Sequence, residues 1–268
     1  MIHPAAIVDP RAQLGPDVQV GPGAVIEAGV ELGAGCRVGP GAFLLGGTLA
    51  GPRNEFHAGC VIGGAPQDLK HRGEPTRLRI GEGNVFREHV TVHRSNHLEE
   101  DTVIGSFNLL MVHSHIGHNC RVGDHNVIAN GALLSGHVEV RSRVFISGNC
   151  MVHQFCRVGT LALMQAGSAI SKDLPPATIA WGGNGLCGLN VVGLRRAGLS
   201  AEERLALRRV YTAVFRGGST VRKAAQAALD GGCSGLAREF AEFILASRRG
   251  IVTERSRTAG SRMVAGGD

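Results

Sequence analysis

The chain has 268 residues, of which 40 are glycine and 10 are proline, and 43% are hydrophobic but only 4% aromatic. So many breakers of regular structure exclude a fold made mainly of long helices, and the core must consist of small aliphatic side chains. The formal net charge is +6, and no stretch is apolar enough over about 18 residues to predict a membrane span.

Residues 1–6 lack the basic segment and apolar run of a secretory leader, so we expect a cytoplasmic location. The seven cysteines are scattered and form no C-x-x-C pair. We interpret them as reduced, buried small hydrophobes rather than as disulfides or zinc ligands.

An aliphatic or similar apolar residue recurs at every sixth position. The step runs from Val8 to Ile62 and resumes in the same phase from Ile80 to Ile170, often with glycine directly after it. A period of six fits neither a helix nor simple alternation, but it suits short strands joined by tight turns. Three hexads make one coil, so residues 18 apart stack at about 4.8 Å. Residues 1–180 are therefore predicted to form about ten coils of a mainly β prism.

Between Ile62 and Ile80 the core steps fall on Asp68 and Glu74. A charged residue has no place in such a core, so residues 64–79 are predicted to leave the prism as a polar excursion. Loops on a rigid scaffold often carry function.

The period ends after residue 176, and residues 177–199 look irregular. Ser200 and Glu203 predict a capping box that opens a helix reaching about Arg216, with Leu205 and Val210 among its buried residues. Two further helices are expected at about 219–230 and 234–249. We thus predict a small helical domain over residues 181–250, followed by a flexible tail over 251–268.

The positive charge is local, because residues 195–268 hold 14 Lys and Arg against 7 acidic residues. There are no interleaved aromatics and no nucleic-acid motif, so no nucleic-acid partner is predicted. The sequence is compatible with two explanations of this positive charge: a solvated helical face, or a docking surface for an acidic protein.

Nine histidines crowd into 65 residues of the hexad region, and the coil period lets several of them line one groove. A histidine suits proton removal from a hydroxyl at physiological pH, and the chain has no serine elbow or cysteine motif for a covalent intermediate. Direct transfer with a histidine base is therefore the favoured chemistry. The nine are His89, His93, His97, His113, His115, His118, His125, His137 and His153.

Seven ordered motifs, running from the first hexads into the helical region, resemble those of the acyl-carrier-protein:UDP-N-acetylglucosamine O-acyltransferases that begin lipid A synthesis. The motifs are residues 66–70 (PQDLK), 73–77 (GEPTR), 115–118 (HIGH), 136–137 (GH), 152–155 (VHQF), 173–176 (DLPP) and 188–196 (GLNVVGLRR). The resemblance implies a homotrimer of left-handed parallel β-helices of hexapeptide repeats, each with a small C-terminal α-helical domain. It also implies transfer of an R-3-hydroxyacyl chain from the phosphopantetheine thioester of acyl carrier protein to the 3-hydroxyl of UDP-N-acetylglucosamine, with no cofactor and no metal.

By the same resemblance, His118 is the general base and the backbone N–H of Gly136 holds the oxyanion. Positions that bind the sugar nucleotide or the acyl chain are matched by Gln67, Asp68, Lys70, His93, His115, His137, His153, Gln154, Asn190 and Arg196. Lys70 and Arg196 suit diphosphate or uracil, because a cation near phosphate forms charge-assisted hydrogen bonds. Basic patches near the carboxyl-terminal region suit the acidic carrier protein.

The chain departs from the family pattern in three places. Asn119 stands where the family has aspartate directly after the base, so we expect a weaker base and a faster enzyme on Asn119→Asp. The family's histidine-containing segment is replaced by residues 182–187, and its contacts are not carried over. Leu98 keeps the hexad phase, so the family's loop between Arg94 and Gly105 is expected to be shortened or absent.

Acyl length in the family is measured at the pocket floor, which Gln165 and Ala166 match. Ala166 is expected to leave a moderately deep pocket, and Ala166→Met to shorten the preferred chain.

Three alternatives stay open on the sequence. A γ-type carbonic anhydrase would hold zinc with histidines such as His113 and His118. Another hexapeptide-repeat transferase would acetylate an amino sugar from acetyl-CoA, and a non-catalytic scaffold would not depend on His118.

Overall fold

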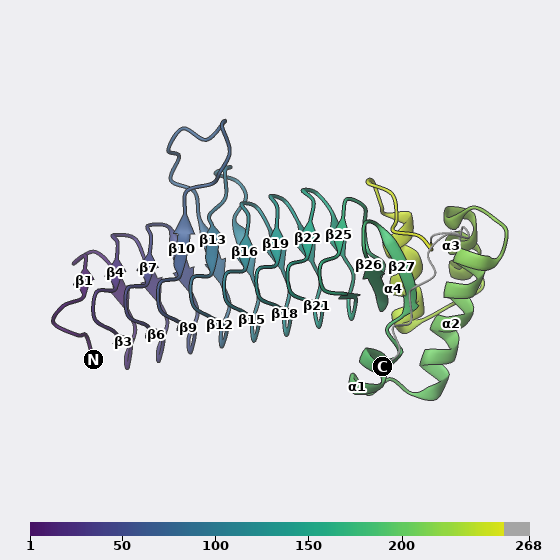
Figure 1. The fold of residues 1–268 in the computed structure, drawn as a ribbon, viewed down its shortest axis with the longest axis horizontal. Coiled ribbons are helices and arrows are strands. Elements are labelled where there is room, and N and C mark those ends of the chain that lie inside the picture. Colours follow the sequence, from purple (N-terminus) through teal and green to yellow (C-terminus); the bar gives the residue numbers. More distant parts are fainter. Residues whose placement is uncertain (255–268) are drawn as a thin grey trace, which may run out of the picture.

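The computed structural model of the chain describes residues 1–254. They form a three-faced prism of parallel strands, with a group of helices packed against its far end and one loop projecting from its side (Figure 1). The mainly β hexapeptide-repeat fold predicted from the sequence is confirmed.

Each face is a sheet whose neighbouring strands come from successive coils. Face 1 consists of β1 (Ile7–Val8), β4 (Val25–Ile26), β7 (Phe43–Leu44), β10 (Val61–Gly64), β13 (Thr91–His93), β16 (His115–Ile116), β19 (Leu133–Leu134), β22 (Met151–Val152) and β25 (Ala169–Ile170).

Face 2 consists of β2 (Gln13–Leu14), β5 (Glu31–Leu32), β8 (Thr48–Ala50), β11 (Leu78–Ile80), β14 (Thr102–Ile104), β17 (Arg121–Val122), β20 (Glu139–Val140) and β23 (Arg157–Val158). Face 3 consists of β3 (Gln19–Val20), β6 (Arg37–Val38), β9 (Glu55–Phe56), β12 (Val85–Phe86), β15 (Leu109–Leu110), β18 (Val127–Ile128), β21 (Phe145–Ile146), β24 (Leu163–Met164), β26 (Thr178–Trp181) and β27 (Gly185–Leu189).

The six-residue step places one apolar side chain of each strand inside the prism. Ile26, Leu44, Ile116 and Leu134 are fully buried or nearly so, and each stacks on its neighbour in the next coil through parallel pairing. Five of the seven cysteines are buried among them, as predicted, but Cys187 is exposed and Cys233 is partly exposed.

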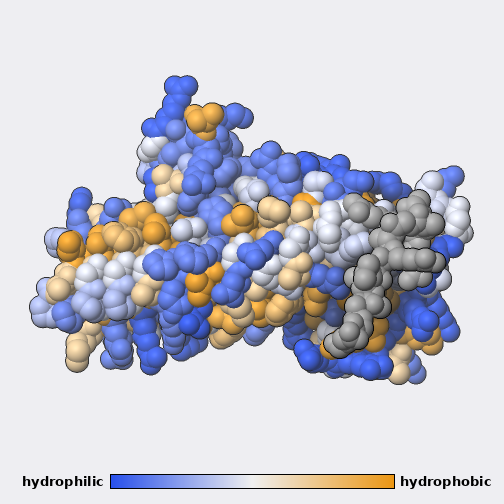
Figure 2. All heavy atoms as spheres, in the orientation of Figure 1, coloured by the Kyte–Doolittle hydropathy of each residue, from blue (hydrophilic) through white to orange (hydrophobic). Residues whose placement is uncertain are grey.

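Two insertions interrupt the prism, and both lie at the corner between faces 1 and 2, which we call the first corner. Val61 pairs with Thr91, 30 positions on instead of 18, because residues 65–77 loop out. This loop is the predicted excursion, beginning one residue later and ending two residues earlier because Gly64 and residues 78–79 belong to strands. Its surface is mostly hydrophilic (Figure 2).

The second insertion corrects a sequence prediction. Leu78 pairs with Thr102, 24 positions on, so residues 94–101 form a loop with six more residues than a plain corner needs. Leu98 lies on this loop and is 52% exposed rather than part of the core. A loop is therefore present, and the expectation that it is absent is wrong.

The segment 177–199, expected to be irregular, is structured. It forms β26, the antiparallel strand β27 and the short helix α1 (Val191–Arg196). Three further helices follow close to the predicted positions: α2 (Ala201–Arg216), α3 (Val221–Asp230) and α4 (Gly235–Leu245).

The predicted capping box opens α2, since Ser200 and Glu203 bond reciprocally. Leu205 is exposed, whereas Val210 and Phe240 are buried. The helix α4 ends four residues before the predicted end, at Leu245.

The described chain closes one end of the prism, where β27 pairs antiparallel to β26. At the other end Ile2 bridges to Val20 in the regular parallel pairing of successive coils. Ile251 bridges to Asp173 and is buried with Val252, so residues 251–254 do not belong to the predicted flexible tail. The rest of that tail, residues 255–268, lies outside the described residues. Every helix among residues 1–254 is too short or too polar to cross a membrane.

Candidate active site

A cleft of about 530 Å³ lies beside the first corner, below the projecting loop. It brings together residues from the loop and from four successive coils. Its lining is Gln67, His93, His115, Gly117, His118, Leu133, Leu134, Ser135, Gly136 and Gln154. Six of the residues expected to bind substrate or act in catalysis therefore share one cleft: Gln67, His93, His115, His118, Gly136 and Gln154.

The imidazole of His118 is held by its neighbour in the chain. Its Nδ1 lies 2.9 Å from Oδ1 of Asn119, whose backbone is left-handed with a φ of 58°. The same Oδ1 accepts the backbone N–H of Asn96 at 3.1 Å, and a backbone N–H can only donate. The amide oxygen therefore faces the ring, so Nδ1 carries the hydrogen and Nε2 keeps its lone pair. This arrangement can accept a proton at Nε2.

Gly136 lies directly against this ring. A Cβ at position 136 would be 2.6 Å from both Nε2 and Cε1 of His118, so only glycine lets the two approach. Within residues 1–254 the Gly136 N–H meets no acceptor, while its carbonyl accepts from Phe155 N–H. A free N–H beside the lone pair of Nε2 is the geometry that an oxyanion needs.

Three further histidines in or beside the cleft make ring contacts. His137 meets it edge to face, with centroids 5.2 Å apart, and stacks on Phe155 at 4.6 Å. His93 meets His115 at 4.8 Å, and the Thr91 hydroxyl lies 2.7 Å from Nδ1 of His115. Burial lowers the pKa of His93 to about 4 and also lowers the pKa values of His115 and His137, so all three favour the neutral form.

The projecting loop is tied to the cleft by Asp68. Its Oδ2 accepts from Nδ2 of Asn96 at 2.6 Å, and its Oδ1 accepts from the Lys70 backbone N–H at 3.0 Å. The Lys70 N–H and the Asn96 amide hold the pKa of Asp68 below its usual range. Asp68 thus positions the loop, while Gln67 faces the cleft and the Lys70 side chain is exposed.

Asn190 and Arg196 are not part of this cleft. They line a second hollow of about 620 Å³ beside face 3, with His125 and Arg143. The Asn190 side chain caps α1 by accepting from Gly193 N–H and donates to Leu161 O at 2.9 Å, so it is committed to its own chain. The exposed Arg196 side chain makes no hydrogen bond or ion pair to any residue among 1–254.

Three further predicted residues lie outside the cleft lining. His153 is exposed, with Nδ1 3.4 Å from the Arg249 guanidinium. Gln165 and Ala166 are exposed on the turn between β24 and β25, two coils beyond the strand β19 that lines the cleft. Their role in acyl length stays a prediction.

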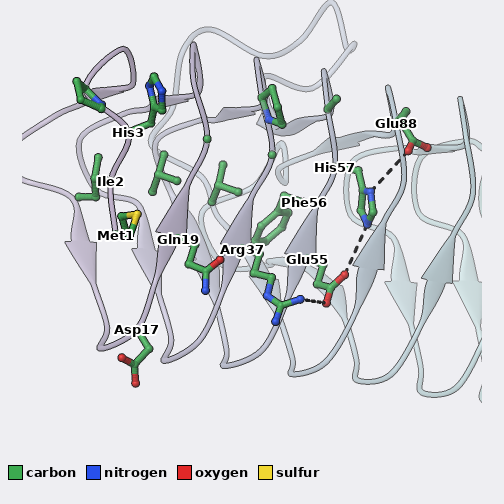
Figure 3. A pocket seen from close by; sticks show the side chains of 17 residues that line it. Met1, Ile2, His3, Asp17, Gln19, Arg37, Glu55, Phe56, His57 and Glu88 are labelled. Atoms are coloured by element: carbon green, nitrogen blue, oxygen red, sulfur yellow. Dashed lines mark hydrogen bonds and ion pairs between the residues drawn. The ribbon is translucent and has the colours of Figure 1, made fainter.

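A larger hollow, about 920 Å³, lies over the first coils of face 3 (Figure 3). Some of its polar side chains are paired with one another: Arg37 lies 3.4 Å from Glu55, and His57 lies 3.6 Å from both Glu55 and Glu88. None of the residues that the sequence predicts for the site lines this hollow, so size does not identify the site.

A metal centre would need several donors at one point. Within residues 1–254, no three His, Cys, Asp or Glu side chains are grouped so that they could hold a metal ion. His113 stacks on His89 with centroids 5.2 Å apart, at the corner between faces 3 and 1 and away from His118.

The sequence did not single out Ser95, Asn96 or Glu100, which the structure places beside Asn119. Asn119 Nδ2 donates to Ser95 Oγ at 2.7 Å and to Glu100 Oε2 at 3.3 Å. No pattern in the sequence points to these contacts, because they depend on the path of the 94–101 loop.

Comparisons with known proteins agree over most of the chain. A family model described as "Udp N-acetylglucosamine O-acyltransferase; Domain 2" matches residues 173–252, and one for six bacterial transferase hexapeptide repeats matches residues 11–46 and 101–136. The acyl-[acyl-carrier-protein]–UDP-N-acetylglucosamine O-acyltransferase of Janthinobacterium sp. (strain Marseille) is 41% identical, over 94% of this chain and 99% of its own length.

Solved structures are equally similar. LpxA of Acinetobacter baumannii has a TM-score of 0.90 at 37% identity, covering 94% of this chain and 99% of that one. LpxA of Bacteroides fragilis, a UDP-N-acetylglucosamine acyltransferase, has a TM-score of 0.90 at 34% identity, covering 94% and 100%.

Proposed function

The chain belongs to the family of acyl-[acyl-carrier-protein]–UDP-N-acetylglucosamine O-acyltransferases, and on that premise we propose how its own residues carry out the reaction. It is an acyltransferase of the first step of lipid A biosynthesis. We propose that the acyl group is R-3-hydroxyacyl, that it comes from the phosphopantetheine thioester of acyl carrier protein, and that the 3-hydroxyl of the sugar receives it without a further cofactor.

In this mechanism His118 is the general base. Nε2 removes the proton of the sugar hydroxyl while the hydroxyl oxygen attacks the thioester carbonyl. The oxyanion of the tetrahedral intermediate accepts the free N–H of Gly136. The intermediate then collapses and expels the thiolate, which takes the proton back from Nε2.

One observation carries this proposal: the fixed Asn119 oxygen holds the hydrogen on Nδ1 of His118, and the Nε2 lone pair faces the cleft beside an unused N–H. Gln67, His93, His115 and Gln154 line the same cleft and can bind the substrates. The neutral state of His93 and His115 suits contacts to sugar hydroxyls, because each neutral ring offers a donor and an acceptor.

We further propose that the active form is a cytoplasmic homotrimer in which Arg196 serves the cleft of a neighbouring protomer. Its unpaired guanidinium is available for a diphosphate, whereas Asn190 positions α1 and thereby Arg196. Each cleft is then completed by two chains.

The test is an assay with UDP-N-acetylglucosamine and a series of hydroxyacyl carrier proteins, with the product identified by mass. We expect an O-acylated sugar nucleotide, and His118→Ala should lower kcat by about 10²- to 10⁴-fold because the base is lost. His113→Asn is the matched control, since it removes an exposed histidine at another corner and should leave kcat unchanged.

Other outcomes would contradict the proposal. Turnover of acetyl-CoA with an amino-sugar acceptor would favour an N-acetyltransferase, and zinc-dependent activity lost in His113→Asn would favour an anhydrase. Full activity of His118→Ala would exclude the base assignment.

A further inference from the structure

The residue that holds the base is an amide, and the structure places the carboxylate of Glu100 within hydrogen-bond distance of its nitrogen. Asn119 is 6% exposed. Its oxygen contacts His118, and its nitrogen faces outward to Ser95 and Glu100. Both of these partners belong to the 94–101 loop.

The direction of every hydrogen bond in this network is fixed. Ser95 Oγ donates to the His97 carbonyl at 3.0 Å, so it accepts from Asn119 Nδ2 at 2.7 Å. An amide nitrogen has two hydrogens, and the second is directed to Glu100 Oε2 at 3.3 Å. The imidazole N–H of His118 therefore donates to the amide oxygen of Asn119, and the amide N–H of Asn119 donates to the carboxylate of Glu100.

Such a chain carries the influence of a negative charge to the ring. A carboxylate that accepts from the amide nitrogen polarises the amide and increases the negative charge on its oxygen, which faces Nδ1 of His118. When Nε2 takes the substrate proton, the ring becomes a cation and this oxygen stabilises it more strongly.

We propose that Glu100 is a positioning residue for the transfer reaction, supplying through Asn119 the negative charge that an aspartate at position 119 would supply directly. This inference rests on the proposed role of His118. It also changes an expectation from the sequence: Asn119→Asp alone would set two carboxylates against each other, so it should give no gain in rate while Glu100 is present.

Other titratable groups lie near the same network but do not replace Glu100. Asp68 is held by Asn96 and the Lys70 N–H on the side of the projecting loop. His97 and His137 lie on the cleft side, with ring centroids 6.4 Å apart. Among residues 1–254, Glu100 is the carboxylate that bonds to the Asn119 side chain.

The test is a double-mutant cycle on the assembled enzyme, using kcat and KM for both substrates. Glu100→Gln should lower kcat about three- to tenfold, with both KM values changed less than twofold, because the charge acts when the ring is protonated. In the Asn119→Asp background, the same Glu100→Gln change should leave kcat unchanged or raise it. Glu99→Gln, which removes the neighbouring exposed charge, should leave kcat unchanged in both backgrounds.

Two results would overturn the proposal. One is that Glu100→Gln lowers kcat equally in the wild-type and in the Asn119→Asp background, as expected if Glu100 only supports the loop. The other is that Glu100→Gln does not lower kcat in the wild-type background. Failure of this inference is distinct from failure of the proposed function, because His118→Ala would then still abolish transfer while the cycle shows no coupling.

Discussion

Burial of a single histidine gives the cleft a built-in acid sensitivity. The Nδ1 atom of His93 is buried without a hydrogen-bond partner, and its ring packs edge-on against His115. Burial first, and then the charges of His115, His118 and Arg94, lower the pKa of His93 from 6.5 to about 4. The folded protein therefore keeps this ring neutral where the unfolded chain would protonate it.

The sign of the effect on stability follows from this difference. Between pH 6.5 and about 4 the unfolded chain binds more protons at position 93 than the folded chain, so the free energy of unfolding falls as the pH falls through this range. Well above pH 6.5 the His93 ring is neutral in both the folded and the unfolded chain, so it no longer makes the free energy of unfolding depend on pH. His115, whose pKa is also lowered by burial, adds in the same direction.

We predict that His93→Asn flattens this dependence. Urea unfolding midpoints measured from pH 4.5 to 8 at one protein concentration should show a smaller slope for the variant, whatever its absolute stability. His3→Asn at the exposed amino terminus is the control and should keep the wild-type slope. An unchanged slope for His93→Asn would contradict the assignment.

At the scale of the element, buried asparagines connect the coils along the corner between faces 2 and 3. Asn54, Asn84, Asn108 and Asn126 lie one per coil, and each side-chain oxygen accepts the backbone N–H of the residue at the same place in the next coil. Asn84 and Asn108 also donate through Nδ2 to the preceding oxygen, at 2.9 Å. The ladder satisfies backbone groups that a tight corner would otherwise leave unpaired.

We predict that Asn108→Ala destabilises the protein by about 1–3 kcal/mol, because the buried N–H of Asn126 loses its acceptor. Gln13→Ala, on the outer side of face 2, should change stability by less than about 0.5 kcal/mol. Urea unfolding at one protein concentration measures both. Equal effects of the two substitutions would mean that the ladder contributes nothing beyond an ordinary surface contact.

The two insertions show what a repeat can and cannot predict. The 65–77 loop was predictable because Asp68 and Glu74 fall on core steps. The 94–101 loop was not, because an insertion of six residues preserves the phase and puts the apolar Leu98 on the expected step. Periodicity alone cannot distinguish a hexad in a coil from a hexad inserted at a corner. A charged residue on a core step, such as Asp68, does distinguish them.

The same limit applies to the site. His118 and Gly136 were expected at the site from the family resemblance, and the repeat explains why they lie close together, since it fixes their height and corner in the prism. The partners of Asn119 could not, since the path of a loop is set by its own hydrogen bonds. The segment 177–199 was missed because its strands and α1 follow no period.

At the scale of the whole molecule, Arg196 and His118 of one chain line different hollows. The proposal that each active cleft takes residues from two chains can therefore be tested. We predict that His118→Ala and Arg196→Ala chains, each nearly inactive alone, recover activity when coassembled. In a cyclic trimer with random 1:1 mixing, about a quarter of the clefts would have both residues intact. Initial rates after coexpression with two different affinity tags measure the recovery.

The control pairs His118→Ala with Gly136→Ala. Both residues belong to the same cleft of the same chain, so no mixed assembly restores it. Absence of recovery with Arg196→Ala as well would mean that Arg196 does not serve a neighbouring cleft.

The antiparallel strand β27 has a consequence for how copies of this molecule can meet. A stack of identical coils is in principle open-ended, since its last coil presents the same pairing groups as every earlier one. Reversing the chain direction at β27, and folding residues 251–254 across the last coil, removes that template. Growth along the axis into a fibre is blocked, and self-association is directed to the long sides of the prism.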